Sequence, residues 1–147
     1  MNRLSLSVQY ADGGDPPPPS RSRVRALIGG ALPDGGEVAV RFVAAAEMRE
    51  INRRRRGKNA ASDILSFAYH EAGAPVLGDI VVCPAAAADV ARRRRRPPSD
   101  HLAHLIVHGA LHLAGWRHDT PRAAARMEKT ERETLARFGV ADPYAPA

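Results

Sequence analysis

The sequence contains little cysteine and no long run of apolar residues. Cys83 is the only cysteine among 147 residues, so the chain forms no internal disulfide. No apolar run approaches the roughly 18 residues that a membrane span requires. The segment Met1–Tyr10 alternates polar and apolar residues, which is typical of neither a signal peptide nor a transit peptide. These absences predict one cytoplasmic domain over residues 1–147, with a core built from the 44% of residues that are hydrophobic.

Lysine and aromatic residues are also scarce. Lys58 and Lys129 are the only lysines, although basic residues outnumber acidic ones by 22 to 16 and the net charge is +6. Arginine therefore carries nearly all the positive charge, much of it in two runs, Arg53–Arg56 and Arg92–Arg96. Two explanations fit equally well: a polyanionic partner such as nucleic acid, or a GC-rich genome in which surface lysines become arginines. Aromatic residues make up only 5%, which argues against a stacking platform for bases.

Hydrophobic periodicity and turn residues predict a mixed α+β fold. Strands are expected at Leu4–Tyr10, Glu37–Val43, Asp63–Tyr69 and Leu77–Cys83, the last two joined as a hairpin. Helices are expected from Ser20 to about Gly30, over Ala44–Arg54, from Pro84 to the second arginine run, from a cap at Ser99 or Asp100 to Gly115, and from Thr120 to Gly139. A stiff, extended linker is expected at Asp12–Pro19. The order predicts one small four-stranded mixed sheet covered by about five helices.

Five of the six histidines lie between His101 and His118. The spacing of His101, His104, His108 and His112 places these four side chains on one face of a helix. Two histidines at positions i and i+4 direct their ring nitrogens toward one point, as a metal ion requires. Several pairs along the row have part of this geometry, so the row alone does not choose among them.

The segment that follows these four histidines indicates which of them are the candidate metal ligands. From His108 to His118 it has the form His-x3-His-x2-Gly-x2-His, and Gly115 allows the chain to turn so that His118 becomes a third ligand to His108 and His112. Three imidazoles leave a fourth position open, as in a catalytic zinc site rather than a closed structural one. His101 and His104 are then expected at the surface or behind the ligands, and Trp116 is expected to fill the core.

The same spacing occurs in the metzincin class of zinc proteases, with one difference. Those proteases have a glutamate directly after the first histidine as general base, and this chain has Gly109. Without that glutamate, a peptidase lacks the residue that takes the proton from the attacking water. A phosphodiester with a neighbouring 2′-hydroxyl depends less on a protein base and more on cations around the phosphorus. Gly109 therefore weighs against a peptidase and is compatible with a phosphodiester substrate such as RNA.

Three blocks between residues 52 and 131 occur in the order of a known family. They are Asn52-x3-Arg56-x-Lys58 with Ser62-Asp63-Ile64-Leu65-Ser66-Phe67; Leu77-Gly78-Asp79-Ile80-Val81; and His108 through Trp116 to His118, followed by Met127-Glu128-x2-Glu131. In these blocks the chain resembles the YbeY family of bacterial rRNA maturation factors and endoribonucleases. It departs from the family at Arg117, where an aspartate usually precedes the third histidine, although Asp119 follows it. Ser62 and Ala68 are milder departures, standing for threonine and proline.

The resemblance implies roles for particular residues. It implies that His108, His112 and His118 bind one zinc ion per chain, and that activity depends on Arg56. From the residues alone, Arg56 in a loop beside Gly57 fits a solvated arginine run better than a phosphate contact; the resemblance favours the functional role. Lys58 is a candidate for a second phosphate contact. Which metal binds remains open, because three imidazoles also suit nickel, cobalt or copper.

The predicted function is a zinc-dependent endoribonuclease specific for single strands. It is expected to act in 16S rRNA 3′-end maturation and ribosome quality control, with the small ribosomal subunit and ribosomal or GTPase proteins as partners. Attack by a metal-activated water and attack by the RNA 2′-hydroxyl both remain open, as does the oligomeric state. Two other functions also remain: a metzincin-like metalloprotease, and a non-catalytic ribosome-associated factor with a structural metal.

Overall fold

The computed structural model describes residues 3–11 and 16–146, in which four strands form a mixed sheet of order β1-β2-β4-β3. The strands are β1 (Leu4–Tyr10), β2 (Gly36–Phe42), β3 (Ile64–Ala68) and β4 (Leu77–Val82). β1, β2 and β4 run parallel, and β3 pairs antiparallel with β4 as the predicted hairpin. The predicted α+β class and mixed four-stranded sheet are therefore confirmed, with β3 as an edge strand.

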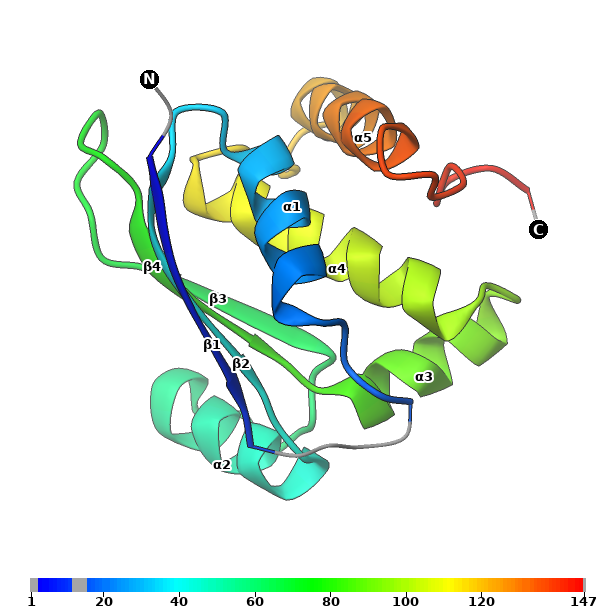
Figure 1. Cartoon of the computed structure of the whole chain (residues 1–147). Coiled ribbons are helices and arrows are strands. Elements are labelled where there is room, and N and C mark those ends of the chain that lie inside the picture. Colours follow the sequence, from blue (N-terminus) through cyan, green and yellow to red (C-terminus); the bar gives the residue numbers. More distant parts are fainter. Residues whose placement is uncertain (1–2, 12–15, 147) are drawn as a thin grey trace.

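Five helices cover the sheet within the described residues (Figure 1). They are α1 (Arg21–Ala31), α2 (Ala45–Arg56), α3 (Pro84–Arg93), α4 (Pro98–Leu113) and α5 (Pro121–Ala136). α1 and α4 lie against one face of the sheet with α5 packed on them, whereas α2 lies on the opposite face (Figure 1). None of these helices has the length and apolar character that crossing a membrane demands.

The helix α4 lies at the centre of the larger hydrophobic core. It is buried on nearly all sides, with Leu102, Ile106 and Val107 at 0–2% exposure, because the sheet, α1 and α5 surround it. A smaller cluster of Val43, Met48, Leu65, Val81 and Cys83 packs α2 against the other face. A helix held this firmly gives the histidine row a fixed frame.

Several predicted boundaries are wrong by a few residues. The cap of α4 is Pro97 rather than Ser99 or Asp100, because Pro98 occupies the first helical position, where a missing N–H costs nothing. α5 ends at Ala136, before Gly139. Of the predicted linker, residues 12–15 lie outside the described part; Pro19 accepts a hydrogen bond from the Tyr10 hydroxyl at 2.6 Å.

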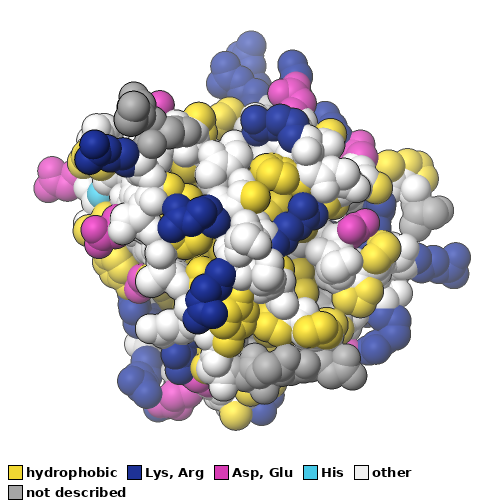
Figure 2. All heavy atoms as spheres, in the orientation of Figure 1, with side chains coloured by type: hydrophobic (Ala, Val, Ile, Leu, Met, Phe, Trp, Pro, Cys, Tyr) yellow, Lys and Arg dark blue, Asp and Glu magenta, His cyan; other side chains and the backbone are white. Residues whose placement is uncertain are grey.

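On the face of the molecule that Figure 2 shows, basic side chains are spread out rather than gathered in one patch. Figure 2 shows them across one face and around its rim, with acidic side chains among them. The surface charge on this face therefore indicates no single binding site by itself.

Candidate metal centre

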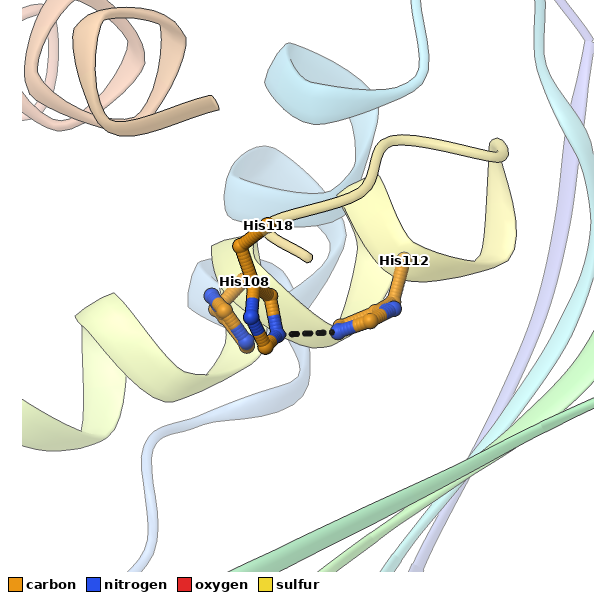
Figure 3. Close-up of side chains that lie close together, drawn as sticks. All are labelled: His108, His112 and His118. Atoms are coloured by element: carbon orange, nitrogen blue, oxygen red, sulfur yellow. Dashed lines mark hydrogen bonds between the residues drawn. The ribbon is translucent and has the colours of Figure 1, made fainter. Parts of the chain in front are cut away.

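Three histidines converge where α4 ends. His108 and His112 lie on the last turns of α4, and His118 lies on the loop that follows (Figure 3). Gly115 has a positive φ of 97°, and the Trp116 N–H donates to the Leu111 carbonyl at 3.1 Å, so the chain turns sharply after the helix. One nitrogen from each ring lies within 4.8 Å of the others. The structure thus brings together the three histidines that the spacing predicts.

The ring nitrogens of this trio suit a cation. His112 Nε2 and His118 Nε2 are 3.0 Å apart, facing each other without a carboxylate between them (Figure 3). Burial and the neighbouring His108 and His118 lower the pKa of His112, which favours the neutral imidazole that can ligate a metal. Two lone pairs at this distance repel each other unless a proton or a metal ion lies between them. The donor set therefore fits a metal with nitrogen preference.

Glu131 on α5 orients the first of these histidines. Its Oε2 lies 2.7 Å from His108 Nδ1 and 3.1 Å from His104 Nε2. A carboxylate only accepts, so His108 Nδ1 carries the proton and His108 Nε2 keeps its lone pair for a metal. The Tyr144 hydroxyl donates to Glu131 Oε1 at 2.5 Å. This is the arrangement by which a carboxylate fixes the tautomer of a metal-binding histidine.

Glu131 is fully buried, yet it is ionised. Burial alone would raise its pKa, but the hydrogen bonds from His104, His108 and Tyr144 outweigh burial and lower the pKa to about 2. The carboxylate thus places one negative charge directly behind the histidine trio. That charge would offset part of the charge of a divalent cation held by the trio.

Sequence reasoning placed Glu131 in a family block but gave it no role. The available signal was its periodicity: Met127, Glu131 and Leu135 recur every fourth residue of α5, so a carboxylate stands in an apolar stripe. Tyr144 gave no signal of this kind, because the chain beyond α5 has no periodic pattern.

The other half of the histidine row is buried. His101 and His104 are 5% and 7% exposed, so the expectation of a surface position is wrong. His104 lies behind the trio in that it shares Glu131 Oε2 with His108. His101 Nε2 lies 3.5 Å from Asp63 Oδ2. His104, His108 and Glu131 form a second group whose atoms lie close enough to hold a metal ion. In that group, however, the short contacts are those of hydrogen bonds from two N–H groups to one carboxylate oxygen.

Gly109 faces the sheet. A Cβ at this position would lie 2.9 Å from Ile64 Cδ1 and 3.4 Å from Ile80 Cγ2. The position after the first histidine is therefore filled by strand side chains, with no room for the glutamate that a metzincin protease requires. The geometry agrees with the sequence in disfavouring peptide hydrolysis.

The two residues beside His118 lie close to each other rather than to a histidine. Asp119 lies 3.9 Å from Arg117, both side chains are largely exposed, and no hydrogen bond joins Asp119 to a histidine in the described part of the chain. Trp116 is 37% exposed, so the prediction that it fills the core is wrong.

The first arginine run is divided among different partners. Arg53 and Arg54 both bind Glu50, at 2.6 and 2.9 Å, and Arg55 stacks on Phe67 at 4.1 Å. Arg56 is the last residue of α2 rather than part of a loop, because Gly57, with a φ of 68°, ends the helix after it. Among residues 3–11 and 16–146, no hydrogen bond or ion pair of the Arg56 side chain is found.

The candidates Arg56 and Lys58 do not touch the histidines. Arg56 is the last residue of α2, the helix on the face of the sheet opposite α4, and Lys58 follows in the loop; both are exposed. The loop that follows them is held by buried Asn52, whose Nδ2 donates to the Ala60 carbonyl at 3.0 Å and to Ser62 Oγ at 3.1 Å. The edge strand β3 lies between the basic candidates and the histidines. Its Ile64 packs near Gly109 of α4, and its Leu65 joins the cluster of α2.

Comparison with known proteins gives the family of the chain. The family model "Endoribonuclease YbeY" matches residues 24–139. The chain belongs to the YbeY family. Relatives within the family carry the name endoribonuclease YbeY: one from Halorhodospira halophila is 40% identical over 98% of both chains, and one from Bordetella pertussis is 44% identical over 98% of both. One from Cupriavidus pinatubonensis is 43% identical over 96% of this chain and 72% of its own.

The fold also has a counterpart among solved structures. The solution structure of TM1509 from Thermotoga maritima has a TM-score of 0.61 to this chain, at 22% identity, over 91% of each chain. At this identity the likeness concerns the fold alone.

Proposed function

We propose that this chain is a zinc-dependent endoribonuclease that cuts single-stranded RNA. The observation that carries the proposal is the convergence of His108, His112 and His118 on one point in a member of the endoribonuclease YbeY family. Three neutral imidazoles match the ligand set of catalytic zinc sites that keep a position open. We further propose that the 147 residues act as one domain in the cytoplasm, in 16S rRNA 3′-end maturation and ribosome quality control. The small ribosomal subunit, with ribosomal or GTPase proteins, is the proposed partner.

The residues of the chain have separate tasks in this proposal. Zinc, when bound by the trio, supplies a Lewis acid for a phosphate oxygen or for the attacking group. Glu131 holds His108 in the ligating tautomer. Arg56, free of the carboxylates that bind Arg53 and Arg54, offers its cation to a phosphate of the RNA strand on the α2 side of β3, and Lys58 adds a second positive charge nearby. A strand of RNA that crosses the edge strand β3 would pass from α2 to the end of α4.

The test is cleavage of a single-stranded precursor of the 16S rRNA 3′ end by zinc-loaded protein. His112→Ala is expected to lose both zinc and cleavage. Arg56→Ala is expected to keep its zinc and to cut roughly 10- to 150-fold more slowly, because a hydrogen bond to a charged phosphate contributes about 1.5–3 kcal/mol. Arg53→Ala is the matched control from the same run, and its rate is expected to stay near that of the wild type because Glu50 already neutralises it.

The possible outcomes separate the alternatives. Equal cutting by all variants would show a contaminating nuclease and contradict the proposal. RNA binding without cutting would support the ribosome-associated factor with a structural metal. A 2′,3′-cyclic phosphate on the product would show attack by the 2′-hydroxyl.

A further inference from the structure

The largest aromatic side chain of the protein lies at the surface beside the metal centre. Trp116 is the only tryptophan, and 37% of it is exposed although the core contains other bulky apolar residues. It is two residues from His118, so the two Cα atoms are at most about 7 Å apart. Folding has left this ring available for contact with a ligand.

Trp116 forms one wall of a hollow between the end of α4 and α5. The hollow has a volume of about 610 Å³, within the range of about 300–1,000 Å³ typical of small-molecule sites. Arg117, Arg126 and Lys129 line it, against a single carboxylate, Glu133. The site therefore combines a flat apolar ring with an excess of positive charge.

The cations of this hollow are weakly paired. Lys129 Nζ lies 3.9 Å from Glu133 Oε1 and Arg117 lies 3.9 Å from Asp119, all with side chains more than half exposed. No hydrogen bond or ion pair of the Arg126 guanidinium is found in the part of the chain that the structure describes. Such solvated pairs contribute little to stability, so the charges remain free to meet phosphates.

We infer that this hollow is a nucleotide subsite for single-stranded RNA, in which a base stacks on the Trp116 indole while Arg117, Arg126 and Lys129 contact the adjoining phosphates. The inference rests on the proposed function, since it names where the strand continues after the phosphate at the histidines. It requires no aromatic platform, because one base on one ring suffices. The aromatic content of 5% therefore does not oppose it.

The single tryptophan makes the subsite directly observable. Titration of the zinc-loaded protein with a 2′-O-methyl single-stranded oligoribonucleotide of about ten nucleotides is expected to quench Trp116 fluorescence in a saturable manner. Trp116→Ala is expected to weaken binding of the same labelled oligonucleotide, followed by anisotropy, roughly 5- to 150-fold, the loss expected for one stacked base. Trp116→Phe keeps an aromatic face and is expected to retain most of the affinity, which excludes misfolding as the cause.

A charge-matched pair tests the phosphate contacts. Arg126→Ala is expected to reduce the slope of log affinity against log salt by about 1. Arg25→Ala, which changes an exposed arginine on α1 that donates to the Leu4 carbonyl of the opposite edge strand β1, is expected to leave the slope unchanged. Absence of quenching together with unchanged affinity of Trp116→Ala would overturn the subsite. If RNA quenches Trp116 fluorescence but is never cut, the proposed function fails while the subsite stands. If RNA is cut without any quenching, the subsite fails while the proposed function stands.

Discussion

The histidine row of α4 has two halves with opposite surroundings. His101 and His104 are buried, and each faces a carboxylate from another element, Asp63 or Glu131. His108 and His112 are partly exposed, and with His118 they present nitrogens to one another. The same residue type on the same helix face therefore serves packing at one end and, in the proposed function, metal ligation at the other. The two halves differ in what packs over them, because the end of α4 is followed by a glycine turn instead of a packed element.

The two halves are connected through one carboxylate. Glu131 contacts His104 of the buried half and His108 of the open half with the same oxygen. Glu131 thus links the orientation of the two halves, and in the proposed function only the open half binds the metal. Removal of the metal should affect the function of the site most. Loss of the Glu131 carboxylate should have a smaller effect, and loss of the Tyr144 hydroxyl that supports this carboxylate the smallest.

Removal of zinc is expected to abolish RNA cleavage and leave the fold intact. The buried half of the row and the apolar residues around it hold α4 without metal. A ligand present at a thousandfold excess over its Kd contributes about 4 kcal/mol to the free energy of unfolding, and typical domains have about 5–15 kcal/mol in total. Circular dichroism and thermal unfolding measure whether the fold is retained. Both are recorded before chelation, after chelation and after zinc is restored. Melting of the chelated protein at room temperature would instead favour a structural metal.

Replacement of Glu131 by glutamine is expected to weaken zinc binding roughly 10- to 100-fold, because the amide holds the His108 N–H less firmly and brings no negative charge. Competition with a chelating dye measures the affinity. Glu133→Gln is the matched control, since Glu133 is exposed on the same helix, and its zinc affinity should equal that of the wild type. Equal affinity in Glu131→Gln would show that the carboxylate has no part in ligation.

Tyr144→Phe is expected to have the smallest effect. It removes one hydrogen bond to a buried carboxylate, which should lower the free energy of unfolding by about 1.5–3 kcal/mol while changing zinc affinity only a few-fold. Denaturant unfolding of the chelated protein measures the first quantity. Tyr69→Phe serves as control, because the hydrogen bonds of the Tyr69 hydroxyl are exposed to solvent and should contribute less. A larger loss of zinc affinity than in Glu131→Gln would reverse the proposed order.

The sequence predicted the sheet, the helices and the trio because each depends on local spacing. Alternation marked the strands, and the interval from His108 to His118 contained its own turn at Gly115. Glu131 and Tyr144 were not assigned roles, because their contacts join residues 23 and 13 positions apart, a separation that no periodicity encodes. Trp116 was placed wrongly in the core, because hydrophobicity predicts burial only when a neighbouring element covers the residue.

The zinc content of two variants tests the central claim most directly. Zinc per chain is measured on the wild type, His118→Ala and His104→Gln after dialysis against the same weak chelator. If the open trio binds the metal, the wild type and His104→Gln keep one zinc per chain and His118→Ala keeps none. Zinc retained in His118→Ala and lost from His104→Gln would place the metal on the group of His104, His108 and Glu131, and would contradict the assignment.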